Sequence, residues 1–458
     1  MTDLVNSPLD RQRDFFRSGG TRSLAFRRRM LDRLARAISD RGDEILAALT
    51  ADLGKSRVEG YSTEVGLCLA EIAYARRNLK KWMRPRRVPG SCLLPLARGC
   101  VLPEPLGVCL VISPWNYPFS LAILPLVACI AAGNCAVLKP SEIAKNTERV
   151  LSRMIADCFG EEYIRVVCGG PDVSQELLGA GWDHILYTGS EQVAKIVMAA
   201  AAQNLTPVTL ELGGKSPCIV AEDCAIDRTA RRIVWGKFLN CGQTCVAPDY
   251  LLVQRGVKDE LIARMKACVT ELYGEDPHRS ADYGRIISER HFDRLHGLLK
   301  DRRVICGGEM DREKLYIAPT LIGDVPPDAS IMGEEIFGPL LPILEYDDVS
   351  EAIAFINRRP KPLALYLFSR STDLQRRVVA ETSSGGVCVN DVVIHLSSPA
   401  LPFGGVGKSG FGRYRGKAGF DALSNPKTIL RQTLLFDIPL RFPPLREKSL
   451  RLLRRMLH

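Results

Sequence analysis

The sequence lacks the residue patterns that mark several common protein classes. Its 458 residues include only 6 histidines, and neither a Cys-x-x-Cys pair nor a His/Cys cluster at zinc-ligand spacing occurs. The 15 cysteines are odd in number and irregularly spaced, which argues against a disulfide framework and favours a reducing compartment. Residues 1–14 are polar and charged, without the apolar segment of a signal peptide. We therefore expect no metal site and a cytoplasmic location.

Membrane-spanning and nucleic-acid-binding features are also missing. Residues 105–138 carry no charge, but Pro118 and Pro125 interrupt this stretch, and short β-rich runs flank a helical piece. This pattern is typical of a buried strand–helix–strand unit and not of a membrane span. The net charge of +10 is spread over helical surfaces, and no basic groove with interleaved aromatic residues accompanies it. A nucleic-acid partner is not expected.

The chain instead has the balance of a globular α/β protein of two or three domains, with 46% hydrophobic and 25% charged residues. Residues 8–82 have helical periodicity, and 84–100 indicate a turn and an extended excursion. Helices then alternate with five predicted strands, at 106–112, 135–139, 163–168, 183–188 and 207–212. This alternation predicts a doubly wound parallel sheet, which binds ligands at the carboxyl ends of its strands. A second alternating region spans residues 217–390.

The segment Asn-Cys-Gly-Gln-Thr-Cys, which ends at Cys245, is the first candidate for chemistry. A thiol attacks as the thiolate, and helix ends or nearby donors lower its pKa. A Gly-Gln-Thr-Cys turn leaves the Cys245 thiol uncrowded. Taken alone, the pattern also fits a structural cysteine.

Two further side chains are candidates for proton transfer and for charge stabilisation. Glu211 ends an apolar strand before two glycines, where loss of hydration raises a carboxyl pKa towards the range of a general base. Asn116 lies between Pro114 and Pro118, so its amide is a fixed donor for a developing oxyanion. The competing interpretations are a surface glutamate and an ordinary asparagine turn.

Polar residues at other strand ends could hold a nucleotide. Lys139 and Glu142 follow the second predicted strand, where they could bind ribose hydroxyls. Gly189 and Ser190 lie between a strand and a helix, where helix N-terminal amides can bind phosphate. No Gly-x-Gly-x-x-Gly follows any strand, so the usual dinucleotide fingerprint is absent. Two glycine-containing segments, 334–339 and 401–410, permit close ligand approach or simply form turns.

Together and in this order, these segments resemble the aldehyde dehydrogenase superfamily, from about residue 8 to 450. The details are similar to class 3, the branch that includes fatty aldehyde dehydrogenases: Trp-Gly-Lys-Phe at 235–238, Ala-Pro-Asp-Tyr at 247–250 and Arg-Phe-Pro-Pro at 441–444. The resemblance implies an α/β aldehyde dehydrogenase fold with a Rossmann-like parallel-sheet cofactor domain, a second α/β catalytic domain and a small bridging β element. Their expected bounds are 1–83 and 101–210 for the NAD(P)-binding domain, 211–410 for the catalytic domain, and 84–100 and 411–458 for the bridging and oligomerisation segments with the tail.

The resemblance also implies a role for each candidate residue. Cys245 matches the nucleophile and Glu211 the base that activates water. Asn116 matches the oxyanion donor, together with the backbone N–H of Cys245. The implied cofactor contacts are Lys139 and Glu142 at the adenosine ribose, Gly189 and Ser190 at the pyrophosphate, Glu335 and Phe337 at the nicotinamide ribose and ring, and Trp115.

The implied reaction is NAD(P)-dependent oxidation of aldehydes, medium- or long-chain aliphatic or aromatic, to acids through a thiohemiacetal and a thioester on Cys245. NAD is expected because Glu142 would repel a 2′-phosphate, although class 3 enzymes often use NADP as well. A CoA-acylating enzyme is the first alternative, but it would not need Glu211. A catalytically silent binding protein is the second, favoured only by a departure from the family pattern: Glu191 adds negative charge beside the phosphate turn, where Ala194 also replaces a glycine.

The expected partners are the aldehyde and, by resemblance, a second copy of the chain in a homodimer. Residues 445–457 predict a basic amphipathic helix with Leu445, Leu452, Leu453, Met456 and Leu457 on one side. Such a helix could lie peripherally on an anionic membrane. The alternative is that it packs on the partner subunit or on its own domain.

Overall fold

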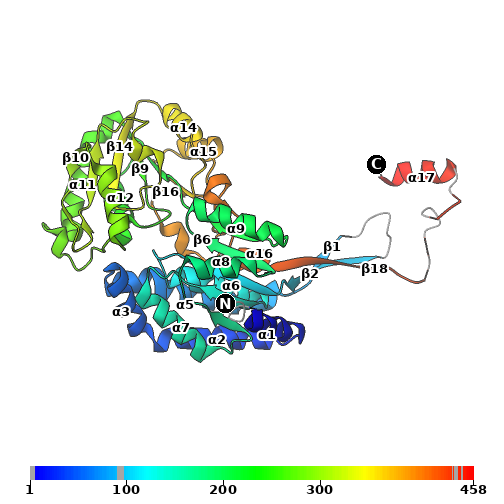
Figure 1. Cartoon of the computed structure of the whole chain (residues 1–458). Coiled ribbons are helices and arrows are strands. Elements are labelled where there is room, and N and C mark those ends of the chain that lie inside the picture. The colour runs from blue at the N-terminus through cyan, green and yellow to red at the C-terminus, as the bar shows by residue number, and fades with distance from the viewer. Residues whose placement is uncertain (1–5, 90–96, 436, 438–441, 445–446, 458) are drawn as a thin grey trace.

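The computed structural model describes residues 6–89, 97–435, 437, 442–444 and 447–457. Two parallel-sheet domains lie against each other, and a narrow β arm extends from the first of them (Figure 1). The expected α/β architecture, with two parallel-sheet domains and a small bridging β element, is present.

The N-terminal region is helical, as predicted. Ser23 caps the second helix by accepting the N–H of Phe26, and Gly54 ends the third with a φ of +65°. The helices are α1 (Asn6–Arg17), α2 (Leu24–Asp40), α3 (Gly42–Leu53), α4 (Arg57–Gly60), a π-helical segment (Tyr61–Val65) and α5 (Gly66–Trp82).

The first sheet has the strand order β17-β7-β6-β3-β4-β5 and is parallel except for β17. Its strands are β3 (Val108–Ile112), β4 (Cys135–Lys139), β5 (Ile164–Val166), β6 (His184–Thr188), β7 (Val208–Glu211) and β17 (Gly410–Phe411). The connecting helices are α6 (Ser120–Ala132), α7 (Lys145–Cys158), α8 (Pro171–Gly179) and α9 (Glu191–Gln203). All five predicted strands are confirmed. Every residue of β4 and β6 is buried, as expected for strands that helices cover on both faces.

The second sheet has the order β10-β13-β14-β9-β8-β15-β16, with only β10 antiparallel. Its strands are β8 (Pro217–Val220), β9 (Tyr250–Gln254), β10 (Arg303–Cys306), β13 (Thr320–Gly323), β14 (Leu340–Tyr346), β15 (Ala364–Phe368) and β16 (Gly386–Val389). The longer helices of this region are α10 (Ile226–Phe238), α11 (Lys258–Tyr273), α12 (Glu289–Leu299), α14 (Val349–Asn357) and α15 (Thr372–Glu381). The predicted alternation of strands and helices over residues 217–390 is confirmed.

The arm is an antiparallel sheet of β1 (Arg86–Val88), β2 (Arg98–Pro105) and β18 (Ser424–Arg431) (Figure 1). The predicted extended excursion therefore becomes two paired strands, and residues 90–96 between them lie outside the described residues. The smaller elements are β11 (Met310–Asp311), β12 (Tyr316–Ile317), α13 (Ser330–Gly333), α16 (Gly416–Ala422) and the tail helix α17 (Glu447–Leu457). Within the described ranges, no helix is long and apolar enough to cross a membrane.

The tail helix α17 lies apart from both domains in Figure 1. On its predicted apolar side, Leu452 is exposed and Leu453 is half-buried. Leu445 and Arg446 lie outside the described residues, as do the side chains of Met456 and Leu457. Whether this helix packs on its own domain, on a partner subunit or on a membrane therefore stays a prediction.

Candidate active site

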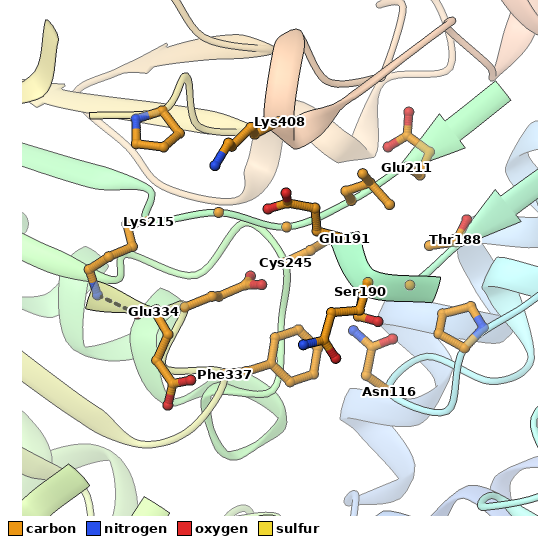
Figure 2. Close-up of a pocket in the computed structure, with 18 of the residues that line it drawn as sticks. Asn116, Thr188, Ser190, Glu191, Glu211, Lys215, Cys245, Glu334, Phe337 and Lys408 are labelled. Carbon is orange, nitrogen blue, oxygen red and sulfur yellow. Dashed lines mark hydrogen bonds between the residues drawn. The ribbon is translucent and has the colours of Figure 1, made fainter. Parts of the chain in front are cut away.

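A cavity of about 610 Å³ lies between the two domains, at the carboxyl ends of the first sheet's strands. In Figure 2, Asn116, Ser190 and Glu211 come from the side of the first sheet, and Lys215, Glu334 and Phe337 from the opposite side, with Cys245 between them. The predicted site residues that line it are Trp115, Asn116, Gly189, Ser190, Glu211, Cys245, Glu335 and Phe337. Lys139 and Glu142 lie outside this lining.

The turn that carries Cys245 has an unusual backbone. Asn240 and Cys241 after α10 have φ values of +52° and +53°, a region that non-glycine residues seldom occupy. The N–H of Asn240 is held by the carboxylate of Glu59 at 2.9 Å. A Cβ at Gly242 would lie 2.2 Å from the carbonyl oxygen of Gly338, so only glycine fits there. This packed turn brings Cys245 to the cavity, where its side chain is partly exposed.

The electrostatics of Cys245 differ from the sequence-based expectation. Burial in the deep cavity raises the pKa of the thiol well above its usual value, and the carboxyl groups of Glu335 and Glu211 raise it further. The backbone N–H groups of Cys245 and Val246 act in the opposite direction but do not prevail. The sequence pattern suggested a turn that favours the thiolate; in the structure, loss of hydration outweighs the local donors.

Glu211 lies at the end of β7 and is buried. Neither of its carboxyl oxygens has a hydrogen-bond partner in the described part of the chain. Burial raises the pKa of Glu211 well above its usual range, and Arg413 offsets this only in part. The predicted direction of the shift is confirmed. A carboxyl group in this state can take up or release a proton within the cavity.

Asn116 is buried and held from both sides. Its Nδ2 donates to the carbonyl oxygen of Gln243 at 3.0 Å, and its own carbonyl oxygen accepts from Lys55 Nζ at 3.0 Å and from Asn240 Nδ2 at 2.8 Å. Lys55 in turn forms a fully buried ion pair with Glu64. An amide group carries two hydrogens, so one remains after the bond to Gln243. The sequence analysis missed the Lys55–Glu64 pair, because no local pattern links it to Asn116.

Lys139 and Glu142 contact each other beside the cavity. Lys139 Nζ donates to the carbonyl oxygen of Pro140 at 2.7 Å and to Glu142 Oε2 at 3.2 Å. The carbonyl oxygen of Lys139 also accepts the N–H of Ser113 at 3.1 Å, which fixes the start of the Asn116 loop. The two residues thus lie at the carboxyl end of β4, the strand next to β3, at the edge of the sheet that faces the cavity.

The turn before α9 has the geometry of an anion-binding helix start. Ser190 is the N-cap of α9, and its hydroxyl accepts the N–H of Val193. A Cβ at Gly189 would lie 2.2 Å from Tyr187 Oη, so any larger residue here would have to displace the Tyr187 ring. The Oγ1 of Thr188 lines the cavity and has no partner among the described residues.

Glu191 and Ala194, the two departures from the family pattern, both lie in the first turn of α9. Glu191 lines the cavity, but its carboxylate pairs with Lys195 Nζ at 2.8 Å, and that bond together with nearby Lys408 lowers its pKa. Figure 2 shows Glu191 and Lys408 on neighbouring parts of the cavity wall. Ala194 is buried. The extra negative charge is therefore accompanied by two lysines.

The loop of Glu335 and Phe337 closes the opposite wall. The Glu335 carboxylate lies against Gly213, where an added Cβ would come within 1.9 Å of Oε2, and it accepts the N–H of Gly214. Burial and neighbouring Asp249 raise the pKa of Glu335 to about 8. The ring of Phe337 meets Trp115 edge to face, with centroids 5.3 Å apart.

The cavity has further charged lining residues that the sequence analysis did not single out: Lys215, Arg294, Lys361 and Lys408. Lys215 lies four residues after Glu211 in the sequence, but its spacing alone does not indicate a function. The set of groups fits a dinucleotide: partnerless hydroxyl and carboxyl oxygens, a helix N-terminus, cationic side chains and an aromatic pair around one space. Among the described residues, no cluster has the composition of a metal site.

The comparisons with known proteins agree with this geometry. Residues 5–429 match the family model described as the aldehyde dehydrogenase family. The chain is 49% identical to aldehyde dehydrogenase family 3 member A2 of Mus musculus, over 95% of this chain and 90% of that protein. It is 46% identical to 4,4′-diaponeurosporen-aldehyde dehydrogenase of Staphylococcus aureus, over 95% of each, and to the dimeric NADP-preferring aldehyde dehydrogenase of Rattus norvegicus, over 96% and 98%.

Comparison with solved structures indicates the same family. The solved structure of the substrate-bound state of Staphylococcus aureus AldH matches with a TM-score of 0.96 and 44% identity, over 99% of both chains. The chain belongs to the aldehyde dehydrogenase family, similar to its family 3 members, and catalyses the NAD(P)-dependent oxidation of aldehydes.

Proposed function

We propose that this enzyme oxidises medium- or long-chain aliphatic, or aromatic, aldehydes to carboxylic acids, with Cys245 as nucleophile, Asn116 as oxyanion donor and Glu211 as general base. The observation that carries the proposal is the convergence of these three side chains on one cavity from separate parts of the chain. The name of the Staphylococcus relative, which specifies 4,4′-diaponeurosporen-aldehyde, supports an aldehyde substrate.

In the first half of the reaction, the thiol of Cys245 releases its proton to solvent water, its sulfur bonds to the aldehyde carbon, and the carbonyl π electrons move onto the oxygen. The resulting thiohemiacetal oxyanion accepts the remaining N–H of Asn116 and the backbone N–H of Cys245. When bound, the nicotinamide supplies the acceptor for the hydride that leaves this carbon. A thioester on Cys245 remains.

In the second half, Glu211 takes a proton from water while the water oxygen bonds to the thioester carbon. The carbon–sulfur bond breaks, the acid leaves, and the sulfur regains a proton. The raised pKa of Glu211 supports this role, because a carboxylate whose pKa is raised by burial is a stronger base towards water than an ordinary one.

We further propose that NAD is the preferred cofactor and that NADP is also used. Lys139 and Glu142 would contact the adenosine ribose, Gly189 and Ser190 the pyrophosphate, Glu335, Phe337 and Trp115 the nicotinamide end. Glu142 disfavours a 2′-phosphate by charge, but its contact with Lys139 Nζ at 3.2 Å weakens that repulsion. The NADP-preferring rat relative supports dual use.

For assembly and location, we propose a cytoplasmic homodimer. Exposed apolar side chains on α9, at Val193, Ile196 and Met198, and Leu430 on the arm offer a surface for a second copy, and the rat relative is described as dimeric. We place α17 on the partner subunit; peripheral contact with anionic membrane is the alternative, which sedimentation with anionic vesicles tests. The proposed domains are an NAD(P)-binding domain of residues 1–83 and 101–210 and a catalytic domain of residues 211–410. The bridging and oligomerisation segments with the tail are 84–100 and 411–458.

Steady-state and single-turnover measurements of NADH formation test the mechanism. Cys245→Ser should abolish activity, and Glu211→Gln should release one NADH per subunit and then stall, because only deacylation needs the base. If wild-type enzyme forms NADH only with added CoA, the acylating alternative replaces this proposal. If it forms none under either condition, the silent binding protein replaces it.

A further inference from the structure

Lys55 and Glu64 form an ion pair in which both side chains are fully buried. Lys55 follows α3, and Glu64 lies in the π-helical segment Tyr61–Val65. A buried ion pair often stabilises a fold no more than apolar residues of the same volume would, because both charges lose their hydration. Stability alone therefore does not explain the pair, and no step of the proposed reaction uses it directly.

The carboxylate of Glu64 is bound to the end of the loop that carries Asn116. Its Oε2 accepts the N–H of Phe119 at 2.9 Å and the N–H of Ser120 at 3.1 Å. Phe119 is the N-cap of α6 and Ser120 is the first residue of that helix. The N–H groups at a helix start have no partner within the helix, and a negative charge is favourable there. Glu64 therefore fixes the point at which the loop becomes a helix.

The ammonium group of Lys55 is bound to the middle of the same loop. Its Nζ donates to the backbone carbonyl oxygen of Asn116 at 3.0 Å and lies 3.9 Å from the centre of the Tyr117 ring, a distance at which a cation is attracted to the ring face. The Oη of Tyr117 and the Oγ1 of Thr244 are 2.7 Å apart, and Thr244 directly precedes Cys245. The ammonium group thus holds both the Asn116 backbone and a ring that reaches the nucleophile's turn.

The Asn116 loop and the turn before the nucleophile are also bound to each other. The carbonyl oxygen of Asn116 accepts from Asn240 Nδ2 at 2.8 Å, and the Nδ2 of Asn116 donates to the carbonyl oxygen of Gln243 at 3.0 Å. Glu59, from the same short segment as the ion pair, accepts the N–H of Asn240 at 2.9 Å. Residues 55–64 therefore contact both parts of the chain that must meet around the oxyanion.

We propose that the Lys55–Glu64 pair is a positioning element that holds the Asn116 amide where it stabilises the thiohemiacetal oxyanion. This inference rests on the proposed function, which assigns the donor role to Asn116. Neither Lys55 nor Glu64 lines the cavity, so both act through the loop that they hold. A displacement of about 1 Å in a catalytic group can lower a rate roughly 100-fold, which is why a fixed loop matters.

The test is single-turnover NADH formation by the full-length enzyme with NAD⁺ and an aldehyde, together with the melting temperature of each variant. Lys55→Met should lower the burst rate roughly 10- to 100-fold and leave the KM for NAD⁺ close to wild type. The double variant Lys55→Met/Glu64→Gln removes both charges and keeps a side-chain oxygen for the N–H groups of Phe119 and Ser120. It should show the same fall in rate, with a melting temperature closer to wild type because no unpaired charge is left buried.

A double-mutant cycle separates positioning from a purely structural role. In an Asn116→Ala background, Lys55→Met should lower the burst rate by less than about three-fold further, because no donor remains to be positioned. A merely structural pair predicts the same fold-loss in that background as in wild type.

Arg27→Met is the matched control. Arg27 is a buried cation of the same domain that also donates to backbone carbonyl oxygens, those of Thr21 and Ala131, each at 3.0 Å. Ala131 lies at the end of α6 away from the Asn116 loop. The variant should lower the melting temperature and leave the burst rate unchanged.

The results distinguish this inference from the function on which it rests. If Asn116→Ala keeps the wild-type burst rate, the oxyanion assignment is wrong and the role of the pair is wrong with it. If Asn116→Ala is slow while the double variant keeps the wild-type rate, the oxyanion donor stands and only the positioning role is overturned. Equal fold-losses with and without Asn116, or a slow Arg27→Met enzyme, would overturn it as well. Failure of both Lys55 variants to fold would assign the pair to folding and would likewise contradict the inference.

Discussion

Replacing Asn116 by alanine removes a predicted transition-state contact at little structural cost. The variant loses the bond from Nδ2 to the carbonyl oxygen of Gln243, but that oxygen keeps the Nδ2 of Asn240 at 3.1 Å. The carbonyl oxygen of residue 116 keeps Lys55 and Asn240, since these bonds go to the backbone. We therefore expect a stability loss of only about 1 kcal/mol. Loss of one oxyanion donor should lower kcat by roughly 10²–10³-fold.

The assay is single-turnover NADH formation, because it follows the step in which the oxyanion forms and the hydride leaves. The burst rate should fall by the stated factor while the KM for NAD⁺ stays close to wild type. Asn134→Ala is the matched control: Asn134 is buried, accepts the N–H of Gly107 at 3.0 Å and donates to the carbonyl oxygen of Leu423 at 2.8 Å, remote from the cavity. It should lower the melting temperature and leave the burst rate intact.

The role of Asn116 would be refuted by a burst rate within about three-fold of wild type. It would also be refuted if the Asn116 and Asn134 variants lost rate and stability in the same proportion, because the effect would then be one of folding.

Three other substitutions test separate parts of the site. Glu142→Gln should raise kcat/KM for NADP⁺ relative to NAD⁺ by several-fold, because the carboxylate beside Lys139 no longer repels a 2′-phosphate; an unchanged ratio would place the adenosine ribose elsewhere. Gly189→Ala should weaken NAD⁺ binding by about ten-fold or more, since the new methyl would lie 2.2 Å from Tyr187 Oη, and equilibrium binding measures it. Lys55→Met leaves the buried Glu64 carboxylate with the N–H groups of Phe119 and Ser120 but without its counter-charge, and should lower the free energy of unfolding in urea by roughly 3–5 kcal/mol; a loss below about 1 kcal/mol would show that the pair is not needed.

The first sheet could be predicted from the sequence because its strands are short apolar runs bounded by glycine, proline and polar turns. The predicted strands 135–139 and 183–188 match β4 and β6 to within one residue. The strands β13 and β14 were missed. β14 contains Pro342 and a glutamate in an otherwise apolar run, so neither alternation nor continuous hydrophobicity marks it clearly.

The identities of the main site residues could be predicted from the sequence, whereas the pKa of the Cys245 thiol and the contacts between distant charged groups could not. Glu211 and Cys245 follow from strand-end and turn patterns together with the family resemblance, whereas Lys55 and Glu64 lie in a region predicted only as helical. Their contacts with the Asn116 loop depend on how α3, the π-helical segment and β3 pack in space. The state of the thiol was missed for the same reason: local donors are visible in the sequence, but the burial that outweighs them comes from the facing domain.

The three acidic groups of the cavity, Cys245, Glu211 and Glu335, should therefore be considered as one system. Burial raises the pKa of each, and the charge of either carboxylate makes it harder for the thiol to ionise. Burial therefore disfavours the ionised form of each group, because a negative charge in this space would lack water. A cation held in the cavity reverses that preference, and the group nearest to it should ionise first.

On this reasoning, thiolate formation at Cys245 is coupled to cofactor binding, so alkylation of Cys245 by iodoacetamide should accelerate when NAD⁺ is added without aldehyde. An unchanged or slower rate, with the Cys245 peptide followed by mass spectrometry, would contradict it.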